Sequence, residues 1–346
     1  MAERLRIAQV APIAGPVTPD TGRSIEHLVW LLTEELARRG HAVTLFATGD
    51  SRTSAALRAV YPRGYDHDDD LWDWQFHELL HMASAFEHAA EFDVIHSHVY
   101  HFALPFTRLV DTPVVHTYHV LPDDDVVRGY ARYPEARIAA ISHYQRRALA
   151  SIPDEAVVHH GVDTEAFPFR PVGGDYLLFL GRIIPHKGPV EAIRLARGAG
   201  MRLVLAGPRD EDYFAAEVAP LIDGRWARYV GPVNARERNA LLAGAAALLY
   251  PVIVPEPFGL VMVEAMACGT PVLALGRGAV PEIVDNGVTG YHACNLESLA
   301  ACLPDALALD RARVREMAVA RFDARRMADD YVALYRRLAS GRRAAP

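Results

Sequence analysis

The chain has 346 residues, of which 51% are hydrophobic and 23% charged, a composition typical of a soluble globular protein with room for two α/β domains. Its net charge of −7 opposes binding to a phosphate backbone, and no apolar run approaches the roughly 20 residues of a membrane span, so neither nucleic-acid binding nor a transmembrane segment is expected. The three cysteines form no C-x-x-C pair, which argues against a zinc ribbon or a disulfide framework and fits a cytoplasmic location.

Along the first half, short apolar runs alternate with helical patterns, as in parallel sheets covered by helices. A helix is expected from Ser24, a good N-cap, to Gly40, a typical stop. The segment 166–175 holds two prolines and two glycines and is expected to be a linker. Strands are expected within RLRIAQVAP (4–12), HAVTLFATG (41–49), FDVIHSHVY (92–100), TPVVHTYHV (112–120) and ARIAAISHY (136–144).

A second series of strands and helices follows the linker, and an Arg-rich amphipathic helix is expected near the end, over 323–339. The predicted fold is therefore α/β, with two doubly wound Rossmann-like domains that face each other across a cleft. Ligands of such folds bind at the carboxyl ends of the strands. The expected strands of this series lie within DYLLFLGRI (175–183), MRLVLAGP (201–208), WARYVGPV (226–233), AALLYPV (246–252) and PVLALG (271–276).

Two glutamates stand in an otherwise apolar stretch, VIVPEPFGLVMVEAMACGTPV (252–272). Glu256 precedes an expected helix that starts near Gly259, and Glu264 lies within that helix. A buried carboxylate without a partner costs several kcal/mol or takes up a proton. The free N–H groups at the helix start favour an anion, and sugar hydroxyls would satisfy both carboxylates.

A second polar loop, LGRIIPHKGPVEAI (180–193), follows the first strand of the second series. Arg182 and Lys187 flank its proline-containing turn, and two cations at a strand's carboxyl end can clamp a diphosphate without a metal. Lys187 is the single lysine among 36 basic residues. The alternative is a solvated loop, where most basic side chains are found.

Together these stretches resemble the retaining glycosyltransferases of family 4, which have the GT-B fold. The resemblance extends over nearly the whole chain, with its motifs in the family's order. In the second half it rests on LGRIIPHKG (180–188), LAGP (205–208), YVGPV (229–233), PEPFGLVMVEAMACGTPV (255–272) and RGAVPEIVDNGVTGY (277–291), the last matching the family's loop and hairpin. In the first half it rests on ELARRGHAVTLFATG, FDVIHSHVY, VVHTYH, ISHYQRR and HHGVDTEAF.

The resemblance implies roles for individual residues. Arg182 and Lys187 would hold the donor diphosphate, Glu264 would bind the ribose hydroxyls, and Glu256 would bind hydroxyls of the transferred sugar. His119 would face the donor sugar. Further donor contacts would come from the backbone at Phe258, Gly259 and Leu260, from Gly181 and Pro208, and from Val233, near which the base is read.

The resemblance also implies a division of labour and a mechanism. Residues 1–168 would form the acceptor-side domain, 169–322 the nucleotide-sugar domain, and 323–346 a helix that packs back on the first domain. A donor phosphate oxygen would take the acceptor's proton during same-face attack, so neither a metal nor another cofactor is expected. A UDP-sugar is favoured as donor, with a GDP-sugar next. The partner would be a small-molecule or glycan acceptor, and a soluble one is favoured.

One departure affects the acceptor side. Family members usually carry a Gly-Gly pair in the loop after the first strand, and here Arg23-Ser24 stand in its place within APIAGPVTPDTGRSIEH. Gly15 or Gly22 would replace the pair, or Arg23 would bring a charge to the acceptor. His98 is assigned to the same side, as a residue that lines the cleft.

Other interpretations of the polar clusters remain. The histidines of HSHVYH (96–101) could bind a metal, but no cysteine joins them and histidines are frequent throughout the first half. The Asp triplets 68–70 and 123–125 resemble metal-binding DxD sites, although solvated loops explain them better. The chain could also be an inactive nucleotide-sugar-binding protein or a non-transferase GT-B enzyme such as a sugar-nucleotide epimerase. A dinucleotide dehydrogenase lacks its GxGxxG fingerprint here.

Overall fold

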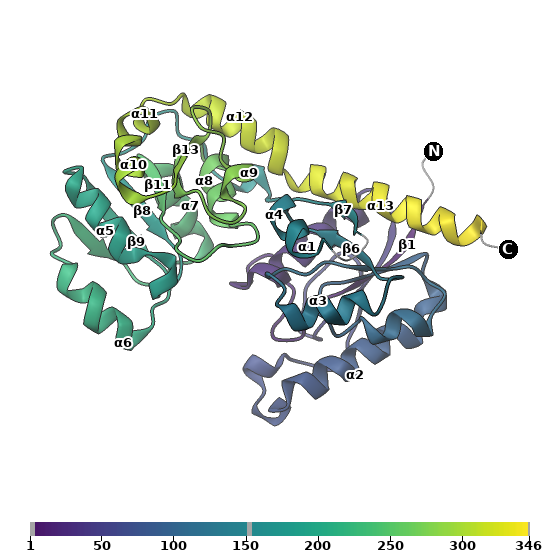
Figure 1. Ribbon diagram of the computed structural model, residues 1–346. Helices are drawn as coiled ribbons and strands as arrows, with labels where there is room; N and C mark the ends of the chain where they lie inside the picture. Colours follow the sequence, from purple (N-terminus) through teal and green to yellow (C-terminus); the bar gives the residue numbers. More distant parts are fainter. Residues whose placement is uncertain (1–3, 151–153, 345–346) are drawn as a thin grey trace. The chain divides into compact units, whose positions relative to one another are not determined.

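The structure is a computed structural model that describes residues 4–150 and 154–344 (Figure 1). The chain divides into two compact units. Unit 1 contains the described residues up to Gly161 together with those from Ala324 onward, and unit 2 is Val162–Asp323. These limits differ from the predicted domain boundaries at 168 and 322, which stay a prediction.

Unit 1 is built on a parallel sheet of seven strands in the order β3-β2-β1-β4-β5-β6-β7. Its strands are β1 (Arg6–Val10), β2 (Ala42–Phe46), β3 (Ala56–Arg58), β4 (Val94–Ser97), β5 (Val114–His116), β6 (Arg137–Ala140) and β7 (Asp154–Val157). Its helices are α1 (Ser24–Arg38), α2 (Trp74–Glu87), α3 (Asp124–Ala131), α4 (His143–Ala148) and α13 (Ala324–Ala344).

Helices cover both faces of this sheet because consecutive strand residues point to opposite sides. Leu45 of β2 belongs to a buried cluster with Val29 of α1. Its neighbour Phe46 belongs to another cluster with Met82 and Phe86 of α2. The near-continuous apolar composition of the strands follows from this two-sided burial.

Unit 2 has a parallel sheet of six strands in the order β10-β9-β8-β11-β12-β13. Its strands are β8 (Tyr176–Leu180), β9 (Arg202–Ala206), β10 (Ala227–Tyr229), β11 (Ala247–Tyr250), β12 (Val272–Leu275) and β13 (Gly290–Ala293). Its helices are α5 (Pro189–Gly198), α6 (Glu211–Tyr213), α7 (Ala235–Gly244), α8 (Leu260–Ala267), α9 (Val280–Ile283), α10 (Leu296–Ala301), α11 (Leu303–Leu307) and α12 (Arg311–Phe322). The two parallel sheets confirm the predicted α/β class.

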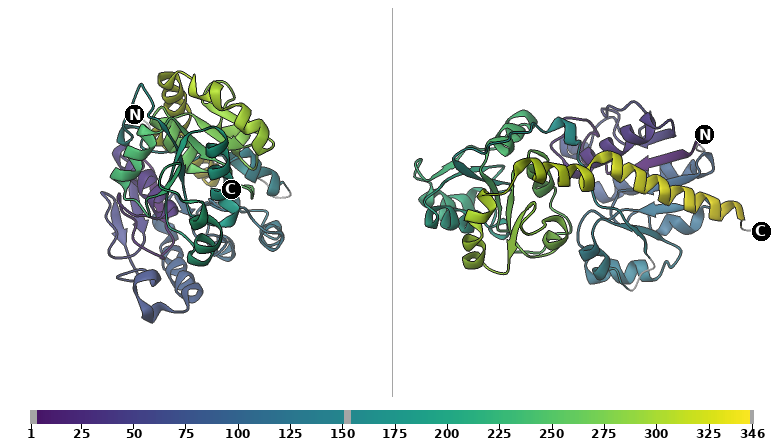
Figure 2. Two further views of the ribbon diagram at one scale, coloured as in Figure 1. Left: turned by 90° about the vertical axis from the view of Figure 1, so that its left-hand side faces the viewer. Right: turned by 90° about the horizontal axis from the view of Figure 1, so that it is seen from above.

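The last helix, α13, belongs to unit 1 and lies along α1 (Figure 2). Arg39, which caps α1, donates to the carbonyl of Arg325 at 2.7 Å and to Asp329 at 3.1 Å. Two tyrosines of α13, Tyr331 and Tyr335, are buried. Their hydroxyls hydrogen-bond to Thr117, just after β5, and to His96 of β4. The end of the chain thereby supplies part of the core of unit 1.

Some local expectations were wrong. Strands β3, β7 and β13 were not anticipated, and β13 pairs in parallel with β12, so the expected hairpin over 277–291 does not form. The two Asp triplets act as helix caps: Asp123 accepts from the amide of Val126 at 2.8 Å, and Asp68 accepts from that of Asp70 at 3.2 Å. Among the described helices, none combines the length and apolarity needed to cross a bilayer.

A buried arginine holds unit 2 together, which leads to a stability prediction. Arg311 is 7% exposed and donates to the carbonyls of Arg170, Ala243 and Ala245 and to the hydroxyl of Thr270. Replacing it with leucine leaves these buried acceptors without a donor, so Arg311→Leu should lower the free energy of unfolding by about 3 kcal/mol. Urea denaturation measures this change.

The matched control is Arg313→Leu, on the same helix. Arg313 is exposed, and its one ion-pair partner among the described residues is Glu316 one turn away, so its loss should change the free energy of unfolding by less than about 0.5 kcal/mol. Equal effects of the two substitutions would contradict the structural role of Arg311.

Candidate active site

The polar residues predicted in unit 2 follow the carboxyl ends of its strands, the edge at which doubly wound sheets bind ligands. Lys187 lies in the loop after β8, and Glu256 lies in the loop after β11, which is the neighbouring strand. The amide of Ile253 donates to the carbonyl of His186 at 2.8 Å, so the two loops are joined through their backbones. The sheet order thus brings together two residues that are 69 positions apart.

Glu256 has protein partners for both of its oxygens. The Lys187 ammonium pairs with Oε1, and the Tyr250 hydroxyl donates to Oε2. Burial and the adjacent Glu256 carboxylate raise the pKa of Tyr250 well above its usual value, which keeps this phenol a donor. The expectation that sugar hydroxyls alone satisfy Glu256 missed Lys187 and Tyr250 as its partners.

Glycine is required beside Glu256. Gly278 follows β12 with φ of 62°, and an added Cβ atom would lie 2.6 Å from the backbone nitrogen of Glu256 and 2.4 Å from its oxygen. The amide of Ala279 donates to that same oxygen at 3.0 Å. The loop after β12 therefore fixes the backbone of Glu256, and any side chain at position 278 would displace it.

Glu264 also has a protein partner. Its carboxylate lies 3.2 Å from the guanidinium of Arg238 in α7, and only 14% of its side chain is exposed. Burial raises the pKa of Glu264, and the charge of Arg238 acts in the opposite direction. No sequence signal distinguishes Arg238, since α7 also carries Arg236 and the chain is rich in arginine.

The start of α8 has no side-chain cap. The helix begins at Leu260, and its N-cap, Gly259, has φ of 99° and offers no side chain to cap the helix. Phe258 is buried against Phe322, which anchors the chain just before the helix. The arrangement suits the binding of an oxygen-rich group at the helix start.

The remaining predicted donor residues occupy neighbouring strand ends. An added Cβ on Gly207 would lie 2.1 Å from the carbonyl oxygen of Gly181, so β8 and β9 end in close contact. Pro208 accepts from the amide of Ile183 at 2.8 Å, and Val233 follows β10. Arg182 is exposed and makes no ion pair with any described residue.

In unit 1, His119 belongs to a buried chain of hydrogen bonds. Gln9 donates to the Tyr335 hydroxyl at 3.1 Å, so its Oε1 accepts from His98 Nε2 at 2.9 Å. His98 Nδ1 therefore accepts from His119 Nε2 at 3.0 Å, and His119 Nδ1 accepts from His160 Nε2 at 3.3 Å. Each neutral ring in this chain carries its proton on Nε2.

Both ring nitrogens of His119 are thus occupied within unit 1. Burial lowers the pKa of His119 to about 3, so the ring is neutral at physiological pH. His98, which was predicted on the acceptor side, is the hydrogen-bond partner of His119, and its predicted role stays a prediction. His96 bonds the hydroxyls of Tyr335 at 2.6 Å and Thr117 at 2.8 Å, which accounts for it structurally.

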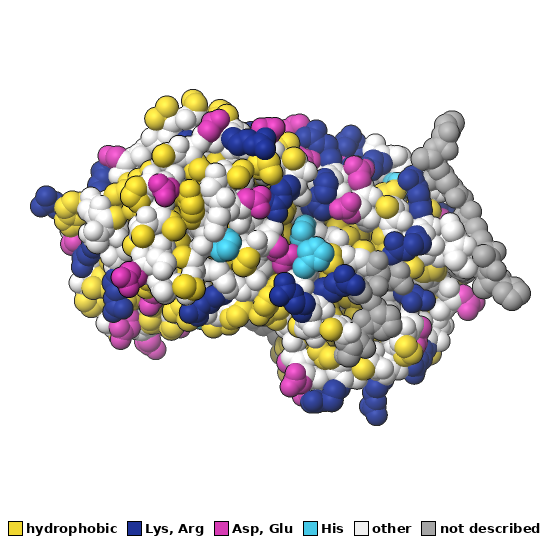
Figure 3. Space-filling model, turned by 45° about the horizontal axis from the view of Figure 1, so that its top comes forward, with side chains coloured by type: hydrophobic (Ala, Val, Ile, Leu, Met, Phe, Trp, Pro, Cys, Tyr) yellow, Lys and Arg dark blue, Asp and Glu magenta, His cyan; other side chains and the backbone are white. Residues whose placement is uncertain are grey.

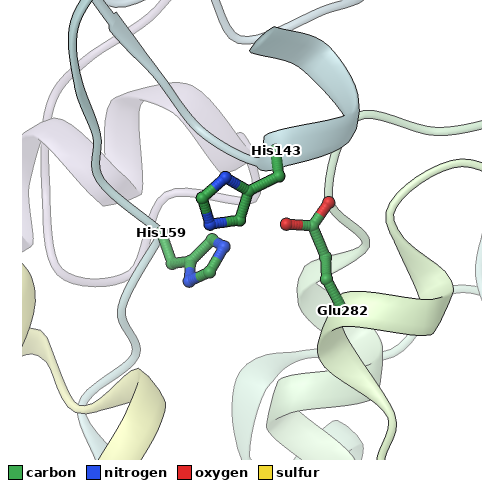
Figure 4. Close-up of side chains that lie close together, drawn as sticks. All are labelled: His143, His159 and Glu282. Carbon is green, nitrogen blue, oxygen red and sulfur yellow. The ribbon is translucent and has the colours of Figure 1, made fainter. Parts of the chain in front are cut away.

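A second pair of imidazoles lies near the end of unit 1's sheet. The rings of His143, at the start of α4, and His159, after β7, have centroids 5.8 Å apart (Figure 4). Glu282, drawn with them, belongs to α9 of unit 2. The sequence patterns predict no role for any of these three residues.

The residues predicted on the acceptor side in the loop after β1, Gly15, Gly22 and Arg23, lie close together. Arg23 forms ion pairs with Asp66 and, at 3.7 Å, with Glu26. An added Cβ on Gly15 would lie 2.9 Å from the Arg23 guanidinium, so Gly15 makes room for this side chain. Gly22 and Arg23 line a cavity of about 410 Å³, together with Pro16, Thr18, Asp20, Thr21, Asp50, Arg52 and His67.

Charged side chains of both signs are interspersed on the face shown in Figure 3, without a continuous basic surface. This agrees with the net charge of −7, and this face therefore has no extended basic surface on which a nucleic acid could bind.

Comparison with known proteins decides the family. The family described as "Glycosyl transferases group 1" matches residues 164–318, and "Glycosyltransferase Family 4" matches residues 25–166. The D-inositol 3-phosphate glycosyltransferase of Frankia alni is 31% identical over 343 residues, which cover 81% of this chain and 84% of that protein. The chain belongs to glycosyltransferase family 4.

Other family 4 relatives and solved structures agree. The D-inositol 3-phosphate glycosyltransferase of Mycobacterium avium is 29% identical over 403 residues, covering 97% of this chain and 94% of that protein. A glycosyltransferase involved in avilamycin A biosynthesis superposes with a TM-score of 0.72 at 27% identity, covering 97% and 98% of the two chains. Sucrose-phosphate synthase from Thermosynechococcus elongatus, with a TM-score of 0.78, 22% identity and coverage of 98% and 100%, shares the fold.

These findings confirm the predicted GT-B fold and the assignment as a glycosyltransferase of a retaining family. Family 4 transferases move a sugar from a nucleotide-sugar donor, and the chain is an enzyme of this kind. The roles of its individual residues stay predictions.

The buried histidines of unit 1 predict a loss of stability in acid. Burial lowers the pKa of His81 and His116 to about 4 and that of His119 to about 3, below the value near 6.5 expected in the unfolded chain. The unfolded state therefore binds more protons below pH 6.5, and each such ring should cost about 1.4 kcal/mol of stability per pH unit down to its folded pKa.

Urea unfolding at pH 7.5, 6 and 5 measures this loss. Tryptophan fluorescence follows mainly unit 1, which holds Trp30, Trp72 and Trp74, whereas unit 2 holds only Trp226. A midpoint for unit 1 that stays constant from pH 7.5 to 5 would show that these rings are not held neutral.

Proposed function

We propose that the chain transfers a sugar, with retention of configuration and without a metal, from a UDP-sugar to a small hydroxylated acceptor. The observation that supports this proposal is the ion pair between Lys187 and Glu256 at the carboxyl edge of unit 2's sheet. It puts a cation for a diphosphate and an acceptor for sugar hydroxyls side by side. The nucleotide base rests on the family resemblance, with a GDP-sugar as the next candidate.

The Lys187 ammonium is suited to stabilise the leaving diphosphate. Without a bound nucleotide-sugar it neutralises Glu256, so neither of these partly buried charges is left without a partner. When the diphosphate arrives, the ammonium can turn toward the phosphate oxygens while sugar hydroxyls donate to Glu256. Lysine fits this exchange because its charge is compact and its stem flexible, unlike the fixed fork of arginine. We propose the exposed Arg182 as a second phosphate contact.

Glu264 is proposed to bind the ribose. Its carboxylate must be ionised to accept two hydroxyl donors, and Arg238 favours that ionised form at 3.2 Å. The amides at the start of α8 add donors for the oxygens of the bound nucleotide-sugar, with Gly181, Pro208 and Val233 on the adjoining loops. The base is expected near Val233.

Catalysis in this proposal is electrostatic. The acceptor attacks the face that the nucleotide leaves, and a donor phosphate oxygen takes the acceptor's proton, so no protein base is needed. By resemblance His119 bonds the transferred sugar, and one of its two present hydrogen bonds must open for this. The three cysteine thiols are unpaired, which fits work in a reducing compartment such as the cytoplasm.

Removing Lys187 should abolish most turnover. Losing one contact that stabilises transition-state charge typically costs about 2.7–4 kcal/mol, so Lys187→Ala should lower kcat at least about 100-fold. Release of the nucleoside diphosphate measures the rate, and a thermal melt checks folding. The control is Arg194→Ala, which removes an exposed cation of α5 and should leave kcat unchanged. Near wild-type turnover by Lys187→Ala would contradict the proposed role of Lys187.

Nucleotide binding should depend on Arg238 in a pH-dependent way. Arg238→Gln removes the charge that lowers the pKa of Glu264, so the carboxyl should protonate at higher pH and lose its ribose contacts. Affinity for the preferred nucleotide among UDP, GDP, ADP and dTDP should therefore fall more at pH 6 than at pH 8, measured by thermal shift. Arg236→Gln, an exposed change on the same helix, is the control.

Equal losses at both pH values would show that Arg238 does not act through Glu264. No thermal shift with any of the four nucleotides, in folded protein, would overturn the proposed function and favour an inactive member of the family.

A further inference from the structure

A second polar cluster lies in unit 1, and the proposed function assigns it no role. Glu26 comes from the first turn of α1, Glu78 from α2, Tyr65 from the short helix at 65–67, and Tyr100 from the loop after β4. The charges of Glu26, Glu78 and Arg23 act on both tyrosine hydroxyls, so the five side chains converge. The elements meet near the carboxyl ends of β1 and β4, the ligand-binding edge of this sheet.

Glu78 is the feature that points to a ligand. It is 1% exposed, and its Oε1 accepts from the amide of Ile13 at 3.0 Å. Its Oε2 is buried and has no hydrogen-bond partner in the part of the chain that the structure describes. A buried acceptor of this kind carries a desolvation cost that a donor group removes. Burial raises the pKa of Glu78 to about 8, and the amide of Ile13 and the hydroxyl of Tyr65 lower it by less.

Tyr65 and Tyr100 border this carboxyl from the partly exposed side. The Tyr65 hydroxyl is near enough to the Glu78 carboxyl to lower its pKa as a hydrogen-bond donor, although it makes no hydrogen bond of ordinary geometry to Oε2. Tyr100 has φ of 38°, and no other described residue except glycine has a positive φ. Such a conformation is strained for a bulky residue, so the fold holds the Tyr100 side chain where a relaxed loop would not.

The arginines of this region are already engaged in ion pairs. The one arginine of the cluster, Arg23, already pairs with Glu26 and Asp66, so it is not free to hold an anion. Arg52, the other arginine of the adjoining cavity of about 410 Å³, pairs with Asp20. A phosphate group entering here would have to compete with Glu26, Asp66 and Asp20 for these two arginines, whereas hydroxyl and ammonium groups would find carboxyl acceptors.

We propose that Glu26, Glu78, Tyr65 and Tyr100 form the acceptor subsite, and that the acceptor is a sugar or cyclitol bearing hydroxyl or amino groups and no phosphate. One of its hydroxyl or ammonium groups donates to Glu78 Oε2 and thereby favours the ionised carboxylate, and the two phenols bond its other hydroxyls. This inference rests on the proposed function and adds the class of acceptor. It separates the chain from its relatives named for D-inositol 3-phosphate, a compound that carries a phosphate.

Matched acceptor pairs test the assignment. Release of nucleoside diphosphate from the preferred donor is measured with myo-inositol against D-inositol 3-phosphate, with glucose against glucose 6-phosphate, and with glucosamine against glucosamine 6-phosphate. Mass spectrometry identifies the products. We expect kcat/KM at least tenfold higher for the unphosphorylated member of any pair that reacts. Equal or higher values for the phosphate ester would overturn the proposal.

Variants link this preference to the cluster. Glu78→Gln should raise the KM of the unphosphorylated acceptor at least tenfold, leave the KM of the donor unchanged, and reduce the preference against the phosphate ester. Tyr65→Phe removes only a hydroxyl and should raise the same KM severalfold, so it carries the test if Glu78→Gln does not fold. Glu87→Gln, an exposed change on the same helix, should alter neither KM.

Two further outcomes separate the two proposals. If the nucleotide thermal shift is present but no unphosphorylated acceptor reacts, or if Glu78→Gln and Tyr65→Phe leave the acceptor KM unchanged, the subsite assignment is wrong and the transferase proposal stands. If no nucleotide binds to the folded protein, the proposed function fails and this inference fails with it.

Discussion

The ion pair between Lys187 and Glu256 is the interaction on which the site of unit 2 depends. It joins the loops after two neighbouring strands, and each of the two partly buried charges compensates the other. Tyr250 and Gly278 support it, one as a donor to the carboxylate and the other as the only residue type that fits against its backbone. The charges of Lys187 and Glu256 therefore balance each other at this edge. In the proposed function, the diphosphate of a bound nucleotide-sugar takes the place of Glu256 beside Lys187, and the sugar hydroxyls take the place of Lys187 beside Glu256.

Unit 1 also has polar side chains in its interior, but these are uncharged. Its central polar groups are neutral imidazoles, an amide and hydroxyls, connected so that each donor meets an acceptor from Gln9 through His98 and His119 to His160. One proton added to this chain would leave two donors facing each other, so the network holds His119 in one tautomer and one orientation. The last helix contributes Tyr335 to the network, and thereby couples the end of the chain to its first strand.

The amino-acid sequence predicts site residues where a residue type is unusual for its neighbours in the sequence or for the composition of the chain. Two glutamates in an apolar stretch and a single lysine in an arginine-rich chain are enough to single out Glu256, Glu264 and Lys187. Arg238 and Glu78 cannot be found in this way because their partners, Glu264 and the amide of Ile13, are distant in sequence and meet them only in the folded chain. Strand β3 escapes prediction because its residues are largely exposed and make no apolar pattern.

The solitary lysine has a practical consequence for the chemistry of the protein. Apart from the amino terminus, the ammonium of Lys187 is the chain's one aliphatic amine, and 20% of its side chain is accessible. An acylating reagent directed at amines therefore has a single internal target, and that target lies at the proposed donor site. The extent of acylation of Lys187 Nζ should therefore report directly whether a nucleotide-sugar occupies the proposed donor site.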